Sequence, residues 1–274
     1  MSAGLLIATV SMMICPTAST SALKTLQAVQ TVCVFLIPAY LTVAIFDRPA
    51  YITLRFHRGF SWQTGATVIL LMLVASPGIN LLGHLNEQMQ LPAFLTDLEA
   101  QLTAMEEAAA ELTERFLQVN NIGGLVINLL VIALLPALAE ETCFRCLCQT
   151  VILQDQRHRH LAIWVTAILF SAIHMQFYGF IPRMLIGALF GYLLVWSGSL
   201  WLPVLAHFVN NANAVILYYI VYHNAKSTDG IDAFGTGDTL WVGIVSLVLT
   251  VVGIYLLRRS LTMSNASSRT SSGN

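Results

Sequence analysis

Long apolar segments recur along this chain, and several approach the roughly 20 residues that an α-helix needs to cross a lipid bilayer. The chain is 57% hydrophobic and only 10% charged, with a mean hydropathy of +0.73. An ordinary soluble domain carries roughly 25% charged residues, so this composition excludes that class. No segment alternates apolar and polar residues over the roughly 10 residues of an outer-membrane barrel strand. We therefore predict an all-α fold, a polytopic bundle of about eight transmembrane helices.

The charges between the apolar segments predict an orientation. The basic segments 47–60, 154–160 and 257–260 are expected to face the cytoplasm, and the acidic segments 84–116 and 224–238 the opposite side. Eight crossings meet both conditions, so we expect an integral protein of the cell (inner) membrane with both termini cytoplasmic. The predicted spans are 3–19, 24–46, 61–83, 122–150, 161–180, 182–198, 200–222 and 239–257.

The chain divides into four expected parts. Residues 1–121 form N-terminal membrane helices and an acidic amphipathic helix at 92–119, which we expect to pack over the bundle. Residues 122–222 form a core, residues 223–260 a loop and the last membrane helix, and residues 261–274 a disordered polar tail. The first residues resemble a signal peptide without its basic region, and we interpret them as a first membrane helix. A net charge of −1 gives no reason to expect a nucleic-acid partner.

The segment 122–150 carries charges that are costly inside a membrane. Glu141 and Arg145 are four residues apart, so they share a helix face and can form an ion pair. Glu140 points about 100° away from Glu141. Pro136, four residues before Glu140, removes a backbone hydrogen bond and predicts a kink before the acidic pair.

The next apolar segments add further polar groups. We expect His174 in the middle of an apolar helix, four residues after Phe170. His207 and Asn211 are also four apart and share a face. Each of these groups is costly against lipid, so we predict that they face one another in one polar cluster inside the bundle.

This set of side chains suits the hydrolysis of an amide bond. A carboxylate with a histidine can take a proton from water and direct the water at a carbonyl carbon. A second histidine and an amide can donate hydrogen bonds to the oxyanion that forms. Alternatively Glu140, His174 and His207 could hold Zn²⁺ in a catalytic site. The spacing alone does not separate these two mechanisms.

Three short motifs in order carry a family resemblance. "EETCFR" at 140–145 matches EExxxR, "FSAIH" at 170–174 matches FxxxH, and "HFVNN" at 207–211 contains HxxxN. Together they resemble the CPBP family, which comprises the type II CAAX prenyl endopeptidases and their bacterial relatives, some linked to bacteriocin processing or immunity. The resemblance covers roughly residues 122–222.

The resemblance implies an intramembrane endopeptidase that acts on a membrane or lipid-linked protein in the lipid bilayer. By this match Glu140 and His174 would activate water, and His207 and Asn211 would stabilise the oxyanion. The resemblance favours a metal-free mechanism without a cofactor, with zinc as the alternative. The supporting residues would be Glu141, Arg145 and Phe170, the first two as an ion pair and the third as a packing residue.

Two other function classes remain open from the sequence. One is a non-catalytic membrane immunity or interaction protein, although an inactive protein would be free to replace these costly polar residues by apolar ones. The other is a transporter or proton relay, since intramembrane Glu and His also mark ion pathways. That class would favour paired broken helices and an internal repeat, neither of which the sequence shows.

Overall fold

The computed structural model describes residues 19–46, 55–152, 156–225 and 233–271, and every regular element within them is helical. The predicted all-α polytopic bundle is thereby confirmed. The elements in chain order are α2 (Thr20–Thr31), η1 (Val32–Leu36), α3 (Ile37–Phe46), α5 (Trp62–Glu87), η2 (Ala93–Leu95), α6 (Thr96–Leu117), α7 (Ile122–Asn128), η3 (Leu129–Leu134), α8 (Leu135–Glu141), η4 (Thr142–Cys148), α9 (Gln149–Ile152), η5 (Gln156–His158), α10 (Arg159–Ala172), α11 (Phe180–Ser197), α12 (Trp201–Ala225), η6 (Gly237–Thr239) and α13 (Leu240–Ser271).

Six helices in the described part of the chain are long and apolar enough to cross a membrane. The helix α10 is a shorter apolar helix, and the span expected at 3–19 lies outside the described residues. The six candidate spans are Thr20–Ile45, Trp62–Glu87, Ile122–Cys148, Phe180–Ser197, Trp201–Asn224 and Gly237–Met263.

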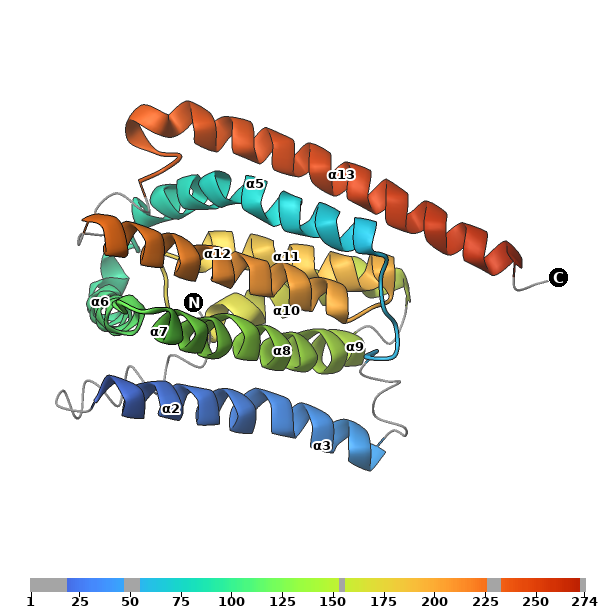
Figure 1. Ribbon diagram of the computed structural model, residues 1–274, viewed down its shortest axis with the longest axis horizontal. Coiled ribbons are helices and arrows are strands. Elements are labelled where there is room, and N and C mark those ends of the chain that lie inside the picture. The colour runs from blue at the N-terminus through green and yellow to red at the C-terminus, as the bar shows by residue number, and fades with distance from the viewer. Residues whose placement is uncertain (1–18, 47–54, 153–155, 226–232, 272–274) are drawn as a thin grey trace.

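The long helices lie side by side, with α2 and α3 along one side of the bundle and α13 along the opposite side (Figure 1). The described parts of the basic segments gather at one end, since Phe60 and Ser260 line one pocket and Arg159 and Arg258 line another. The acidic helix α6 lies across the other end of the bundle and is seen nearly end-on (Figure 1). Basic and acidic segments are thus separated along the helix axes, as their charge pattern predicts.

The apolar face of α6 packs on the bundle. Leu112 and Phe116 are fully buried and join a cluster with Leu23 of α2 and Val215 of α12. Removing these side chains from water or lipid headgroups favours the packed position. The helix therefore covers the bundle end as its three- and four-residue apolar spacing predicts.

Pro77 interrupts α5, and a side chain from α13 repairs the break. The N–H of Gly78 donates to Ser246 Oγ at 2.9 Å, and this hydroxyl donates to the carbonyl of Val74 at 2.6 Å. The hydroxyl thus stands between a donor and an acceptor that a regular helix would join directly. A Cβ at Gly78 would lie 2.9 Å from Ser246 Oγ, so glycine makes room for the repair.

The end of the chain differs from the expectation of a disordered tail at 261–274. The helix α13 extends to Ser271 and includes most of that segment. Neither proline nor glycine occurs in the segment before Gly273, so nothing in its backbone chemistry stops a helix that has already begun.

Candidate active site

Two wide helical turns flank the acidic pair. The helix from Ile122 to Ile152 changes to a π-helix at η3, returns to an α-helix at α8, and changes again at η4. Glu140 and Glu141 lie at the end of α8, and both are 0% exposed. Turns of this kind are rare and occur often at functional sites. They mark the interruption that Pro136 predicts before the acidic pair.

Glu141 holds two partners, one on each carboxylate oxygen. Arg145 Nε donates to Oε2 at 2.8 Å, which is the predicted ion pair four residues apart. The Nδ1 of His207 lies 3.0 Å from Oε1. A buried carboxylate needs such partners, because an isolated charge costs several kcal/mol in the interior. The pair Glu141–Arg145 therefore ties α8 and η4 to the histidine of α12.

The ring of His207 is fixed on all sides. Because a carboxylate only accepts hydrogen bonds, Nδ1 carries the proton that it donates to Glu141. The opposite nitrogen, Nε2, then faces Glu140, with 4.0 Å between Nε2 and Oε2. The ring stacks on Phe190 at 5.3 Å between centroids and meets Phe170 edge-on at 5.9 Å. Glu140 and Nε2 of His207 therefore lie close enough to act on one reacting group.

Asn211 repairs the break that Pro136 makes. Ile132 is four residues before Pro136, whose nitrogen carries no hydrogen to donate to the Ile132 carbonyl. The Nδ2 of Asn211 donates to that carbonyl at 3.2 Å, and Asn210 donates to Asn211 Oδ1 at 3.2 Å. An amide NH₂ has two hydrogens, so one remains after the bond to Ile132.

His174 does not lie in the middle of a helix, contrary to the expectation. The helix α10 ends at Ala172, and His174 lies in the turn that follows. Three residues after the end of the helix, Met175 has a positive φ of 53°, a left-handed conformation that non-glycine residues rarely adopt. Such backbone strain persists only where the surroundings impose it, and it is common near functional sites.

The turn gives His174 one defined tautomer. Its Nδ1 lies 2.7 Å from the carbonyl of Phe170, and a carbonyl only accepts, so Nδ1 carries a proton. The other nitrogen, Nε2, is buried and has no hydrogen-bond partner among the described residues. In the neutral ring Nε2 is an acceptor, which is the state required of a proton-accepting group.

Asn86, at the end of α5, holds this turn at both ends. Its Nδ2 donates to the carbonyl of Phe177 at 3.1 Å, and its Oδ1 accepts from the N–H of Ile181 at 2.8 Å. Ser171 Oγ donates to the carbonyl of Phe180 at 2.7 Å. The strained turn is therefore closed by side chains of α5 and α10.

Phe170 occupies the centre of the cluster. Its ring meets His174 at 5.2 Å and His207 at 5.9 Å, both edge-on. The guanidinium carbon of Arg145 lies 5.2 Å from the ring centroid, within range of a cation–π interaction. Phe170 thus lies between Arg145, His174 and His207 and fixes the two imidazole rings. The seven residues singled out from the sequence come from α8, η4, α10, the following turn and α12.

Two further residues next to the turn were not foreseen. Arg183 donates from Nη2 to Gln176 Oε1 at 2.7 Å, and Glu106 of α6 accepts from the N–H of Tyr178 at 3.1 Å. Burial raises the pKa of Glu106, and the Tyr178 N–H and the charge of Arg183 oppose this rise. The signal for Arg183 was present in the sequence, because it is a charge within the apolar segment 182–198. No such signal exists for Glu106, one of several glutamates on its helix.

A zinc site requires ligands at about 2.0–2.3 Å from one point. Within the residues that the structure describes, no three His, Cys, Asp or Glu side chains are placed to hold a metal ion. His207 already uses Nδ1 for Glu141.

Comparison with known proteins agrees with the motifs. Residues 122–213 match the model of a family described as "Type II CAAX prenyl endopeptidase Rce1-like". The "Uncharacterized protein YpbD" of Bacillus subtilis (strain 168) is 32% identical over 89 residues, or 31% of this chain and 42% of that protein. The chain thus matches less than half the length of that relative. No solved structure matches the chain. With six helices in the described residues that are long and apolar enough to cross a membrane, the chain is an integral membrane protein, and the resemblance read from the motifs is confirmed: residues 122–213 carry the pattern of the Rce1-like type II CAAX prenyl endopeptidases.

Proposed function

We propose that this protein is an intramembrane endopeptidase that hydrolyses a peptide bond of a membrane or lipid-linked protein without a metal. The family match supports a CAAX-type intramembrane protease kind of function. The observation that carries the proposal is the buried cluster, in which Glu140 faces Nε2 of His207 while Glu141 and Arg145 fix that ring from the other side. An arrangement this costly to bury is expected where it performs chemistry.

In the proposed reaction Glu140 and His174 activate a water molecule. The carboxylate of Glu140 takes a proton from the water, and Nε2 of His174 accepts a hydrogen bond from it. The water oxygen forms a bond to the scissile carbonyl carbon, and the carbonyl oxygen becomes an oxyanion. When this intermediate collapses, the C–N bond breaks and the proton on Glu140 passes to the leaving nitrogen.

The proposed oxyanion site consists of His207 and Asn211. A His207 protonated on both nitrogens would donate from Nε2 to the oxyanion, while its Nδ1 stays hydrogen-bonded to Glu141. Asn211 would donate the amide hydrogen that Ile132 does not use. Both donors are fixed before substrate binds, which is the condition for strong stabilisation of developing charge.

The experiment compares peptide termini of membrane and lipid-linked proteins in cells that carry wild-type protein or Glu140→Gln at matched expression. We expect specific termini to disappear in the variant, because glutamine cannot accept the proton. Glu111→Gln, an exposed carboxylate on α6, is the matched control and should leave the termini unchanged. Identical termini in wild type and Glu140→Gln, with any phenotype retained, would favour the non-catalytic interaction protein instead.

The metal-free part of the proposal has its own test. With the purified protein and a substrate from the first experiment, a strong chelator should leave turnover unchanged. Loss of turnover on chelation, restored by added Zn²⁺, would replace the metal-free mechanism by the zinc alternative with Glu140, His174 and His207 as ligands.

A further inference from the structure

A groove opens between α10, α11 and α13 on the outside of the bundle, away from the acidic pair. Its volume is about 540 Å³. Along most of its length the walls are apolar, with Leu185 and Leu189 from α11 and Val251 and Ile254 from α13. Val251 is 67% exposed, so the groove faces the surroundings of the bundle, which for these helices is lipid.

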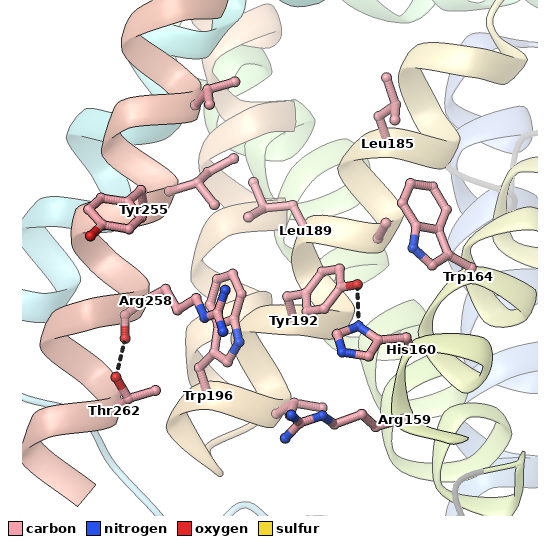
Figure 2. Close-up of a pocket in the computed structure, with 14 residues that line it drawn as sticks. Arg159, His160, Trp164, Leu185, Leu189, Tyr192, Trp196, Tyr255, Arg258 and Thr262 are labelled. Atoms are coloured by element: carbon pink, nitrogen blue, oxygen red, sulfur yellow. Dashed lines mark hydrogen bonds between the residues drawn. The ribbon is translucent and has the colours of Figure 1, made fainter. Parts of the chain in front are cut away.

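The two ends of the groove differ in chemistry (Figure 2). The end beside Leu185 and Trp164 is apolar, whereas Arg159, Arg258 and Thr262 gather at the opposite end. Arg159 begins α10 and Arg258 lies on α13, so the two cations come from different helices. Neither arginine forms an ion pair with an acidic side chain in the described part of the chain.

Aromatic side chains line the boundary between these ends. His160 Nδ1 and the Tyr192 hydroxyl lie 2.8 Å apart, and the ring of Tyr192 stacks on Trp196 at 5.2 Å between centroids (Figure 2). Tyr and Trp concentrate at the level of the lipid headgroups, where one side of the ring meets hydrocarbon and the other meets water. These rings therefore mark the depth at which a headgroup would lie.

We propose that this groove is a binding site for an anionic phospholipid. The acyl chain lies against the apolar wall, and the phosphate lies between Arg159 and Arg258. Leu185 and Trp196 are 11 positions apart on this wall, or about 16 Å at about 1.5 Å per residue, enough to bury much of one acyl chain. A zwitterionic lipid would bring its own cation beside the arginines, so the site favours net negative charge. Basic pockets between membrane helices bind anionic headgroups in this way.

The bound lipid would join two parts of the bundle. Its phosphate would bridge α10 to α13, which line opposite sides of α11 in the groove. This site does not depend on the proposed proteolysis, because none of its residues belongs to the acidic cluster. Its functional consequence is structural: the protein holds its outer helix more firmly in a membrane that contains anionic lipid.

The test uses the full chain in nanodiscs that contain equal amounts of phosphatidylglycerol and phosphatidylcholine with identical acyl chains. Lipids retained on the protein after release are counted by native mass spectrometry. We expect phosphatidylglycerol to be retained preferentially. An arginine near the surface contributes roughly fivefold to such binding, so Arg159→Gln/Arg258→Gln should lower the preference by about 30-fold. Glycerol phosphate added in the same experiment should not displace the lipid, because it lacks the acyl chain.

Arg259→Gln is the matched control, since Arg259 is the next residue on α13, is exposed, and does not line the groove. It should retain the wild-type preference. Arg159→Lys/Arg258→Lys keeps both positive charges and should retain most of the preference for phosphatidylglycerol. If the glutamine variant does not fold, this variant and a salt titration of the wild type test the proposal. Equal retention of the two lipids by the wild type, or an equal loss in Arg259→Gln, would overturn the proposal. So would displacement by glycerol phosphate alone, which would identify a phosphate site without a lipid chain.

Discussion

Pro77 in α5 and Pro136 in α8 each interrupt the hydrogen bonding of a helix, and the two breaks are repaired in different ways. At Pro77 in α5, the hydroxyl of Ser246 serves both the donor Gly78 and the acceptor Val74. At Pro136, the amide of Asn211 serves only the acceptor, the carbonyl of Ile132. A hydroxyl has one hydrogen, which the first repair consumes, whereas an amide keeps a second hydrogen after its repair.

The repair at Pro77 is structural, whereas the repair at Pro136 leaves an amide hydrogen that is available for chemistry. Around Pro77 the repair uses an uncharged hydroxyl, which bonds to both the N–H of Gly78 and the carbonyl of Val74. Around Pro136 the repair is followed one turn later by buried carboxylates with Arg145 and His207 as partners. Mutations around Pro77 should therefore change mainly the stability of the protein. Mutations around Pro136 should change both stability and turnover.

The largest effect on stability is expected from Arg145→Gln. This change leaves Glu141 buried without its strongest partner, and breaking a buried ion pair costs about 3–5 kcal/mol in the free energy of unfolding. Thermal unfolding in detergent measures it. The double variant Glu141→Gln/Arg145→Gln removes the uncompensated charge and should recover part of the stability without activity. A double variant no more stable than Arg145→Gln would contradict this account.

A smaller effect on stability, and a large one on turnover, is expected from Asn211→Ala. Removing one donor of an oxyanion site lowers kcat by about 10²–10³-fold. The Ile132 carbonyl also loses its donor, at about 1–3 kcal/mol in the free energy of unfolding. Single-turnover kinetics would measure the loss in kcat, with a peptide substrate that the wild-type protein is known to cleave. Unchanged kcat with lowered stability would mean that Asn211, like Ser246, has only a structural role.

Ser246→Ala tests the other side of the comparison. The variant leaves the N–H of Gly78 and the carbonyl of Val74 without the bridging hydroxyl, so we expect a loss of about 1–3 kcal/mol in the free energy of unfolding. Turnover should stay at the wild-type level at a temperature where both proteins are folded. A loss of turnover as large as that of Asn211→Ala would remove the distinction between the two breaks.

The smallest effect is expected from Glu106→Gln, beside the turn that carries His174. The pKa of Glu106 is raised by burial above the ordinary value of 4.5, so the folded protein binds this proton more tightly than the unfolded chain. Stability is then lost as the pH rises above 4.5 through the raised pKa. Glutamine keeps an acceptor for the Tyr178 N–H and removes the pH-dependent cost.

The melting temperature of Glu106→Gln should therefore exceed that of the wild type slightly at pH 7, and the difference should vanish near pH 4. The difference between the two proteins isolates Glu106 from other carboxylates. A variant less stable than wild type at pH 7 would mean that the ionised carboxylate contributes more through Arg183 than burial costs.

The sequence predicts the helices and the members of the cluster better than the geometry within it. The ion pair Glu141–Arg145 follows from helix spacing, and the interruption near Pro136 follows from the missing N–H. The turn at His174 does not, because "FSAIHMQF" contains neither glycine nor proline, and the Asn86 that bonds to this turn lies about 90 positions away along the chain. The contact between Glu141 and His207 joins residues 66 positions apart, which no local pattern encodes.

Asn86 also couples α5 to the candidate site mechanically. Its side chain bonds to both Phe177 and Ile181, so the turn between α10 and α11 cannot lengthen or shorten independently of α5. Glu140, Glu141 and Arg145 have no such attachment in the described contacts of Asn86. A displacement of α5 along its own axis would therefore change the separation of His174 from Glu140 while the ion pair stays intact. The part of the proposed water site that carries His174 is thus attached to α5, whereas Glu140 belongs to α8.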